Sequence, residues 1–441
     1  MSALSPELVD RVAQALLDAF DPRFGGFGTG GKFPHPEALD FVLLYAEKSG
    51  NPAFREMAQK TLTALAEGGL RDSVEGGFFG YCATRDWRQP TTEKRLETQA
   101  GLLRNFLEGW QLFGRPEFRK TAQQTLSYIG HVLRDPATGA WFSSQDGDDA
   151  YYALSARERA DRKPPRVEPA ISATSLCATI SALLKAGVVL GDEMATSHAQ
   201  AGVRFLVETL SSPGRGVYHR YDGARRILGR LVDQVYAVRA LLHVVQYTGD
   251  NERLGLIEDL IEVALRKESR IRGGFYDLRD DDPGFEAARQ RPSTLLENGL
   301  FAEALVRAHC LTGRAEYRAL AERTLTAFAT DFQSYGYLVA EYGRAVELFC
   351  HPPQRIFVVG ARGTPASDEL LGVARRTYAP SKLVLALDPV ADADLLARHG
   401  LAAGPIAAAH LFVEGGTAAV VTDPAELPAA MARAEQLRSR R

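Results

Sequence analysis

The sequence predicts a mainly α-helical fold, an (α/α)6 toroid of six helical hairpins followed by a small α/β subdomain. Three observations lead to this prediction. Loops that combine glycine with aromatic residues recur at intervals of roughly 50 to 80 residues, segments of helical period lie between them, and short apolar stretches follow residue 351. Recurrence of this kind is typical of repeat architectures, in which each unit is one supersecondary element.

The glycine-aromatic loops are the most regular feature. They are "FGGFG" (24–28), "GGFFGY" (76–81), "GAWFSS" (139–144), "GRGVYHRYD" (214–222), "GGFYD" (273–277) and "YGYL" (335–338). A second signal lies between them: a glycine that ends one helix, then a polar residue or proline that starts the next, as in "SGNP" and "FGRP". The alternation of the two signals predicts helices that run up and down in turn.

The segments between these signals have helical period. In 52–67, for example, Phe54, Leu62 and Leu65 lie on one face, between a proline start and a double-glycine end. The same pattern predicts twelve helices, near 5–20, 36–48, 52–67, 93–113, 116–133, 170–186, 192–210, 230–248, 251–268, 293–311, 315–330 and 339–350. They form five hairpins with one lone helix at each end, so pairing of the first and last helices would close a ring.

This topology has a geometric consequence. Because successive helices run in opposite directions, all six glycine-aromatic loops are expected at one mouth of the toroid. The helices that follow the loops would then start at that mouth, with their partly positive N-termini directed toward it. If these are the inner helices, the mouth is a natural site for a polar or anionic ligand.

The character of the chain changes after His351. Short apolar stretches at 355–361, 382–388, 408–414 and 417–423 predict strands, with helical sequence between the first two. We therefore divide the chain into a barrel, 1–350, and a small α/β subdomain, 351–441. The strand–helix–strand order resembles nucleotide folds, but no glycine-rich phosphate motif accompanies it.

Composition argues against several classes of protein. The chain is 45% hydrophobic and 24% charged with a formal charge of −3, so we expect neither nucleic acid nor a membrane as a partner. Its four cysteines form no CxxC pair, and no HExxH motif is present, so we expect no disulfide framework, metal or cofactor. No signal peptide and no apolar run long enough to span a bilayer is evident, which predicts a cytoplasmic protein.

The ordered motifs resemble one known family. "GGFGTGGKFPHP" (25–36), the loop 76–94 with its Glu-Lys end, "GAWFSSQDGDD" (139–149) and "TGRAEYRALAERTLTAFA" (312–329) resemble the thioredoxin-domain-containing family of YyaL-like and spermatogenesis-associated protein 20-like proteins. The resemblance extends over nearly the whole chain. It implies an (α/α)6 barrel similar to six-hairpin glycosidases and N-acylglucosamine 2-epimerases, and it names no reaction.

The chain also departs from this family. The family's barrel follows an N-terminal thioredoxin-like domain, which we expect this chain to lack together with its cysteines. Thr91-Thr92 stand where the family has His-Phe, and Ser175-Leu176 where it has Trp-Asn. The residues that match the family's pattern are Glu93, Lys94, Asp146, Asp148, Asp233 and Asn298. The resemblance thus implies the fold, and a separately encoded thioredoxin-like protein as a possible partner.

Carboxylates in the mouth loops are the candidate catalytic residues. Asp146 follows an aromatic loop, and glycoside chemistry needs two carboxyl groups roughly 5–9.5 Å apart across the scissile bond. Neighbours on one loop rarely flank a substrate, so we expect the second group from another loop: Asp86, Glu93 or Asp277. The structural alternatives are a solvated turn for Asp146 and helix capping for Glu93.

Other polar and aromatic residues of the mouth are candidates for substrate binding. Aromatic rings can stack on sugars, but in glycine-rich loops they more often pack the loop onto the barrel. Polar groups at helix starts are about equally well explained as caps. The candidates are Lys32, His35, Tyr81, Trp87, Lys94, Asp148, His219, Asp233, Tyr276, Glu297 and Asn298.

These features together predict a sugar- or polyol-directed enzyme with glycosidase-like acid–base chemistry and a carbohydrate-like small-molecule ligand. Epimerisation is the alternative chemistry, less favoured because only His35 and His219 are expected among many mouth carboxylates. A further alternative is a non-catalytic binding or assembly module that partners a separate thioredoxin-like protein. Fold-level likeness does not decide between them, because one fold hosts many chemistries.

Overall fold

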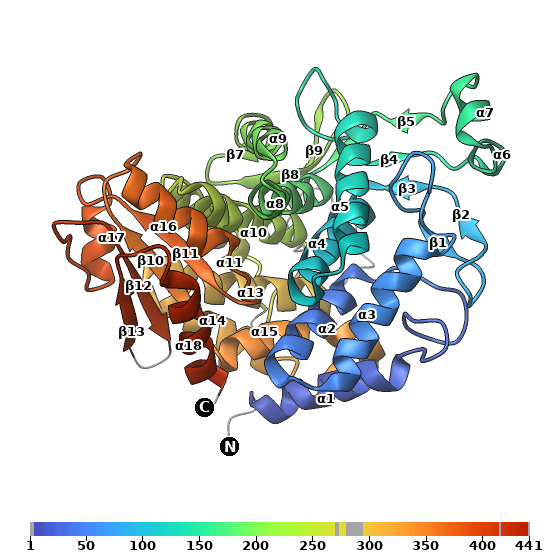
Figure 1. Cartoon of the computed structure of the whole chain (residues 1–441). Coiled ribbons are helices and arrows are strands. Elements are labelled where there is room, and N and C mark those ends of the chain that lie inside the picture. Colours follow the sequence, from blue (N-terminus) through green and yellow to red (C-terminus); the bar gives the residue numbers. More distant parts are fainter. Residues whose placement is uncertain (1–3, 270–272, 279–293, 414–415, 440–441) are drawn as a thin grey trace.

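Helix pairs form a closed ring in the computed structural model, which confirms the (α/α)6 barrel (Figure 1). The structure describes residues 4–269, 273–278, 294–413 and 416–439. The inner helices are α2 (Pro36–Ser49), α4 (Leu96–Phe113), α8 (Ala173–Leu190), α10 (Leu231–Thr248), α13 (Leu295–Thr312) and α15 (Ala340–Cys350). The outer helices are α1 (Pro6–Ala19), α3 (Pro52–Glu67), α5 (Pro116–Tyr128), α9 (Glu193–Phe205), α11 (Arg253–Leu265) and α14 (Ala315–Thr326). Each inner helix contacts the next, and α15 contacts α1 and α2, which closes the ring.

Glycine sets the turn at the end of the barrel opposite the mouth. Five inner helices end at a glycine in the left-handed region, with φ between 64° and 81°. These glycines are Gly50, Gly114, Gly191, Gly249 and Gly313. Because a side chain at positive φ is strained, glycine allows the chain to reverse here and start the outer helix a few residues later.

Two outer helices differ from the predicted continuous segments. The predicted helix 116–133 changes at Ile129–Leu133 into a π-helical turn, and the predicted helix 192–210 changes in the same way at Leu206–Leu210. Such turns insert an extra residue into the helical repeat. Periodicity alone does not predict them, because a single added residue leaves the apolar pattern nearly intact.

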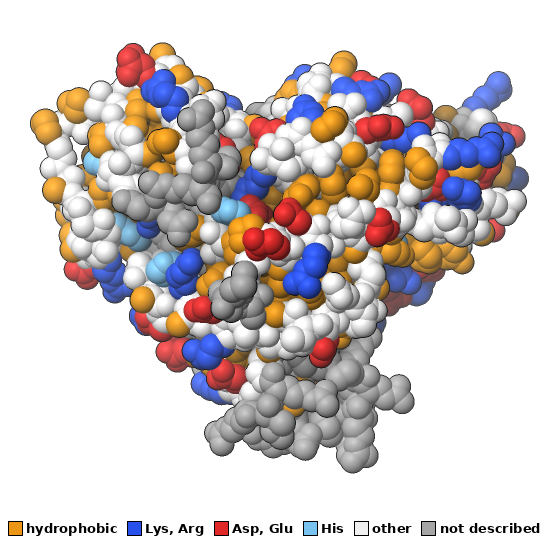
Figure 2. Space-filling model, turned by 90° about the horizontal axis from the view of Figure 1, so that it is seen from below, with side chains coloured by type: hydrophobic (Ala, Val, Ile, Leu, Met, Phe, Trp, Pro, Cys, Tyr) orange, Lys and Arg blue, Asp and Glu red, His pale blue; other side chains and the backbone are white. Residues whose placement is uncertain are grey.

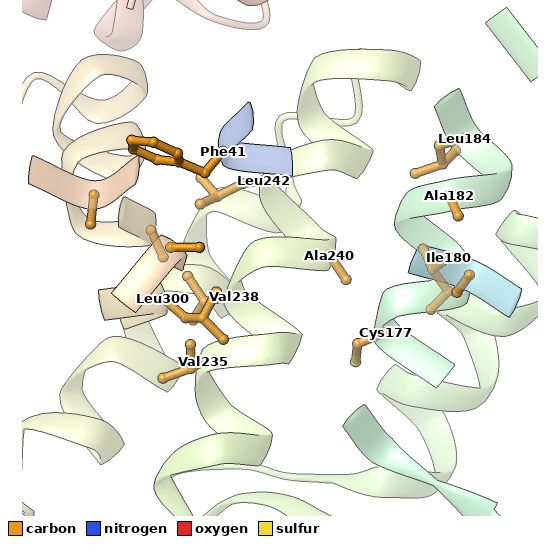
Figure 3. Packing of buried hydrophobic residues seen from close by; sticks show 14 of the residues in the cluster. Phe41, Cys177, Ile180, Ala182, Leu184, Val235, Val238, Ala240, Leu242 and Leu300 are labelled. Carbon is orange, nitrogen blue, oxygen red and sulfur yellow. The ribbon is translucent and has the colours of Figure 1, made fainter. Parts of the chain in front are cut away.

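The barrel wall is held by apolar contacts between adjacent inner helices. Figure 3 shows Val235 and Val238 of α10 facing Leu300 of α13, and Cys177 and Ile180 on α8. All five side chains belong to one continuous buried cluster. The helix α8 is long and apolar enough to cross a membrane by length and composition, but 72% of this stretch is buried inside the fold. Packing in the barrel wall therefore accounts for its apolar sequence.

The loops meet at one end of the barrel, as predicted, and neighbouring loops contact one another through strand pairing and ring stacking. Lys32 bridges to Cys82, and Phe27 stacks on Tyr337 with ring centroids 5.7 Å apart. Short strands supply the other links: β1 (Tyr81–Cys82) with β2 (Pro90–Thr91), β3 (Lys94–Arg95) with β4 (Ser144–Gln145) and β5 (Val167–Glu168), and β6 (Ile171–Ser172), β7 (Ser211–Ser212) and β9 (Arg225–Leu228) with β8 (Gly216–Tyr221). Two short helices, α6 (Asp149–Tyr152) and α7 (Ala156–Ala160), lie between β4 and β5.

The C-terminal subdomain is a four-stranded sheet with helices, as predicted. Its strands are β10 (Arg355–Val359), β11 (Leu383–Leu387), β12 (Ala408–Val413) and β13 (Gly416–Val421), in the order β11-β10-β12-β13, and only β10 and β11 are parallel. Its helices are α16 (Pro365–Arg376), α17 (Ala393–Arg398) and α18 (Leu427–Ser439). The sheet packs on the glycine-turn end of the barrel, where Asn251 donates a 2.7 Å bond to the Ala386 carbonyl.

Buried ion pairs hold two of the mouth loops. Asp72 accepts backbone N–H bonds from Val74 and Glu75, and its carboxylate lies 2.7 Å from Nζ of Lys94. Although burial raises the pKa of Asp72, Arg159 and Lys94 together hold this pKa below its usual value. The first loop repeats the arrangement with Asp21 and Lys32, 2.8 Å apart and both fully buried. Lys32 and Lys94, predicted to bind substrate, thus form buried ion pairs that hold the loops. Lys94 also lies over three aromatic rings.

Amide side chains at the fourth residue of three inner helices also hold the loops, through hydrogen bonds to the loop backbone. Gln99 accepts the N–H and donates to the C=O of Phe78, both at 2.7 Å. Asn298 makes the same pair of bonds to Phe275, at 2.7 and 3.0 Å. Gln234 repeats the pattern on Val217. Asn298 was predicted to contact a sugar; instead its amide satisfies buried backbone groups that would otherwise be costly.

Removal of the Lys94 ammonium should destabilise the barrel. In Lys94→Met the Asp72 carboxylate stays buried with only Arg159 opposite it, so we expect the free energy of unfolding to fall by about 3 kcal/mol. Urea denaturation followed by circular dichroism would measure this change.

The matched control is Lys120→Met. Lys120 is exposed on α5, and its replacement should change the free energy of unfolding by no more than about 0.5 kcal/mol. Equal stability of Lys94→Met and Lys120→Met would contradict the structural role given to Lys94.

Candidate functional site

A cavity of about 530 Å³ opens at the mouth. Its volume lies within the range usual for small-molecule sites. Five of the inner helices and the first two mouth loops line it among the described residues. The polar and aromatic residues that line it include Phe33, His35, Glu37, Tyr81, Thr91, Glu93, Arg95, Glu97, Arg104, Ser181, Tyr236, Arg239, His243 and Glu341.

Three glutamates occupy the same position in three inner helices. Glu37, Glu97 and Glu341 are the second residues of α2, α4 and α15, and all three line the cavity. An acidic residue is favoured at a helix N-terminus by the helix dipole. The ring places three such residues around one space, which dipole preference alone does not require. None of the three was among the predicted site residues.

The environment of Glu37 alters its ionisation. The side chain is exposed to the cavity, yet protein surrounds it on nearly every side. Burial raises the pKa of Glu37, and the carboxylates of Glu341 and Glu97 add to this effect against the opposing N–H of the helix start and Arg104. Glu341 itself is 2% exposed, and its Oε2 atom has no hydrogen-bond partner in the described part of the chain. A carboxyl group whose pKa is raised, as that of Glu37 is, can hold a proton beside an ionised neighbour.

Arginines form a second layer about two helical turns deeper. Arg104 and Arg239 are the ninth residues of α4 and α10, seven positions after the residues that line the rim. Arg104 pairs with Asp40, while Arg239 lies 3.7 Å from Glu303. Arg344 bridges these two carboxylates, at 3.3 and 3.1 Å. The cavity therefore changes from acidic at its rim to basic at its floor.

Two histidines also line the cavity. His35 precedes Pro36 and has a left-handed backbone, φ 41°, which is strained for a non-glycine residue. Burial lowers its pKa to about 4. Burial, with Arg307 and Arg239, lowers the pKa of His243 well below its usual value, and its Nδ1 atom has no partner among the described groups. Both imidazoles are therefore neutral at pH 7.

The structure brings three of the predicted site residues to this cavity. They are His35, Tyr81 and Glu93. Tyr81 stacks on Phe33 with ring centroids 4.8 Å apart, and Glu93 pairs with Arg95 at 3.0 Å. The paired rings present an apolar face beside the acidic rim.

The other predicted catalytic carboxylates lie in separate networks outside the cavity lining. The side chain of Asp146, in the segment between β4 and β5, is 48% exposed and pairs with Arg166 at 3.2 Å. Asp86 pairs with Arg88 at 3.3 Å beside another surface hollow. The predicted face-to-face arrangement of Asp146 with Asp86, Glu93 or Asp277 is therefore not found.

Asp277 belongs to a chain of polar contacts with two predicted binding residues. It lies 2.6 Å from Arg230, which donates to His219 Nε2 at 3.2 Å, and His219 Nδ1 in turn lies 2.9 Å from Asp233. Burial raises the pKa of Asp233, which His219 and Arg230 oppose. Arg230, the residue that joins this group, was not predicted. The network fixes the fourth and fifth mouth loops to each other at the start of α10.

The remaining predicted binding residues have local structural partners. Trp87 is buried and donates to the Phe24 carbonyl at 2.9 Å, while Asp148 caps α6 by accepting the Tyr151 N–H. The Tyr276 hydroxyl accepts a bond from Ser269, and the Glu297 N–H donates to Thr294 at the start of α13. No group of three His, Cys, Asp or Glu residues suited to a metal ion occurs within the described ranges.

Curated proteins with a similar sequence include three mammalian proteins of one name. The chain is 31% identical over 192 residues to spermatogenesis-associated protein 20 of Homo sapiens, which is 40% of this chain and 24% of that protein. The rat protein of the same name is 34% identical over 143 residues, 31% of this chain and 18% of the relative. The chain thus matches about a quarter or less of each relative's length. No family model matches the chain.

Solved structures with the same architecture include sugar-processing enzymes. A cellobiose 2-epimerase from Bacillus thermoamylovorans superposes with a TM-score of 0.60 at 13% identity, over 75% of this chain and 88% of the other. A glycoside hydrolase family 76 mannosidase from Bacteroides thetaiotaomicron gives 0.56 at 9% identity, over 77% and 98%. At these identities the likeness concerns the fold alone. This chain is therefore similar in part to spermatogenesis-associated protein 20, of the thioredoxin-domain family, and has the (α/α)6 barrel found in sugar epimerases and glycoside hydrolases.

Proposed function

We propose that this protein is a sugar-directed enzyme that performs glycosidase-like acid–base chemistry in the mouth cavity. The observation that carries the proposal is the trio Glu37, Glu97 and Glu341, in which burial and, to a smaller extent, the neighbouring carboxylates raise the pKa of Glu37. A protonated and an ionised carboxyl group facing one space are what glycoside hydrolysis requires. The sugar-processing enzymes that share the fold support the substrate class.

In this mechanism Glu37 is the general acid. It protonates the glycosidic oxygen as the bond to the anomeric carbon breaks, so the leaving alcohol departs neutral. Glu341 is the second carboxyl group, because it lines the same cavity and its buried Oε2 has no hydrogen-bond partner in the described structure. It removes a proton from the attacking water or stabilises the positive charge that develops on the sugar. Glu97, exposed to the cavity, keeps the negative potential that favours the proton on Glu37.

Other lining residues supply binding groups. Phe33 and Tyr81 form a stacked aromatic surface on which a sugar ring can lie. Arg104 and Arg239 lie deeper, where their guanidinium groups can donate to hydroxyl or carboxylate oxygens. In this proposal one face of a sugar lies on the aromatic rings and its polar edge contacts the arginines.

Epimerisation is a second candidate, favoured by one observation. His35 and His243 both line the cavity and are both neutral at pH 7. A neutral imidazole can remove a proton from the carbon beside a sugar carbonyl, and a second acid–base group can return it to the opposite face. The overall reaction then inverts one carbon without a net change in protons.

Replacement of Glu37 by glutamine should abolish hydrolysis and leave the fold intact. The amide keeps the shape but cannot donate the catalytic proton, so we expect kcat for chromogenic aryl glycosides to fall by about 10²–10⁴-fold. Asp146→Asn, which alters an exposed carboxylate outside the cavity lining, is the matched control and should retain activity. Full activity in Glu37→Gln, or its loss in Asp146→Asn, would favour the originally predicted Asp146 site.

The pH dependence of activity and that of stability should both reflect the raised pKa of Glu37. Because the folded state raises the pKa of Glu37, this state keeps a proton that the unfolded chain loses near the usual glutamate pKa of about 4.3. Wild-type stability relative to Glu37→Gln should therefore decline as the pH rises through this window, and kcat/KM should decline with it. Thermal melts and rate profiles from pH 4 to 8 would measure both. A stability difference that grows with pH would refute the sign.

Epimerisation makes a separate prediction. An enzyme that removes a carbon-bound proton should incorporate deuterium from heavy water into unreacted or product sugar, as detected by NMR. We expect His243→Asn to lose this exchange while Glu37→Gln affects it less. Hydrolysis without any carbon-bound deuterium would exclude the second candidate.

A further inference from the structure

A second cavity lies at the opposite end of the barrel, between its floor and the C-terminal subdomain. Its volume is about 60 Å³, room for about two waters at the roughly 30 Å³ that each occupies in the liquid. The barrel contributes Lys185, Gln246 and Tyr247, and the segment after α16 contributes Tyr378 and Lys382. The two cavities share Arg104, Ser181 and His243 in their linings, so they meet at these side chains.

Positive charge dominates this lining. The cationic residues are Arg104, Lys185, Arg307, Arg344, Arg375 and Lys382, and the single acidic residue among the described lining groups is Glu108. Glu108 lies 2.5 Å from Lys185. Arg104 and Arg344 pair with Asp40, and Arg307 pairs with Glu303. Arg375 and Lys382 form no ion pair with a carboxylate within the described residues, and Asp368 acts on Arg375 only from beyond ion-pair distance.

Lys382 and Arg375 differ in how their donors are used. The Lys382 ammonium donates to the carbonyls of Ala374 and Arg375 at 2.8 Å and also to that of Thr377, so it caps the end of α16. Arg375 donates through Nε to the Gln246 carbonyl at 3.0 Å, but its Nη2 atom is buried without a partner. The buried hydroxyl of Tyr378 also lacks a partner. Unpaired buried donors are costly unless an acceptor reaches them, and beside several cationic groups an acceptor that carries negative charge is favoured.

We propose that this basal cavity binds one phosphate-class oxyanion, held by the Arg375 guanidinium and the Tyr378 hydroxyl. An oxyanion accepts several hydrogen bonds and offsets charge, whereas water satisfies the donors and leaves the charge uncompensated. A nucleotide or a whole sugar is too large for the space, while a single phosphate or sulfate group fits. The anion can be free, or it can be the charged end of a molecule that reaches down from the mouth.

The surroundings of these cations support the site. Burial lowers the pKa of Arg375 to about 10, and burial together with Lys185 lowers that of Lys382 to about 7. Both cations are therefore held in surroundings that disfavour their charge. The proposal also gives the C-terminal subdomain a role, because it supplies Arg375 and Tyr378 while the barrel supplies the opposite wall.

Calorimetric titration of sodium phosphate into the full chain at constant ionic strength tests the site. We expect saturable binding of one phosphate per chain, at least tenfold weaker in Arg375→Gln and several-fold weaker in Tyr378→Phe. The matched control is Arg376→Gln, which removes the same charge from the next, exposed residue and should bind like the wild type. Circular dichroism would confirm that each variant is folded. If Arg375→Gln does not fold, Tyr378→Phe tests the site in its place.

Two results would overturn the proposal. One is the absence of saturable binding to the wild type, which would mean that water alone fills the cavity. The other is equal affinity in all folded variants. If the wild-type chain binds phosphate but hydrolyses no glycoside, only the proposed function is refuted, because phosphate binding is measured without a reaction.

The source of the anion is resolved by a second titration with glucose 6-phosphate and glucose. If the phosphate belongs to a substrate, the ester should bind more tightly than inorganic phosphate, and both Arg375→Gln and the mouth variant Glu37→Gln should weaken it. If the anion is free, the ester should bind no better than phosphate, and Glu37→Gln should have no effect.

Discussion

The buried Asp72–Lys94 ion pair and its counterpart Asp21–Lys32 fix the loops on which the mouth cavity depends. Burial of two charges is costly unless geometry and added hydrogen bonds compensate, and here backbone N–H groups and loop carbonyls complete both pairs. A Cβ at Gly77 would lie 2.7 Å from the Tyr128 ring, so the loop approaches the barrel as closely as its backbone permits. These contacts therefore determine where the loop that forms part of the cavity wall packs on the barrel.

Because the inner helices all start at the mouth, the position of a residue within its helix determines how deep in the barrel it lies. Three of the six inner helices carry a rim glutamate at the second position, while at the ninth position α4 and α10 carry arginines and α13 carries Glu303. Figure 2 shows acidic and basic side chains interspersed on the outer face seen from below, so this ordering belongs to the interior rather than to that surface. A ligand with a neutral or cationic part at the rim and a negative part below would match the gradient.

The helices and loops could be predicted because glycine and proline act locally, at the residue where each helix stops or starts. Most of the site could not be predicted beyond His35, Tyr81 and Glu93, because its other residues are defined by contacts between distant parts of the chain. Lys94 is an unexplained cation at a helix start until Asp72, 22 residues earlier, is seen beside it. Glu37 resembles an ordinary acidic residue at a helix start, and only its recurrence at the same position in α4 and α15 distinguishes it. Comparison of equivalent positions across the repeats, rather than of loop composition, is the signal that could have found it.

The boundary predicted at residue 350 separates two kinds of secondary structure but not two hydrophobic cores. In β10, Phe357 and Val359 belong to the barrel cluster, whereas Ile356 and Val358 pack with α16 and α18. Strand alternation therefore gives the sheet one face for the barrel and one for its own helices. Because the same sheet carries α16 to the barrel floor, docking of the subdomain and placement of Arg375 in the basal cavity are one event. A change that loosens the sheet would thus alter the charge at the base of the barrel as well as its stability.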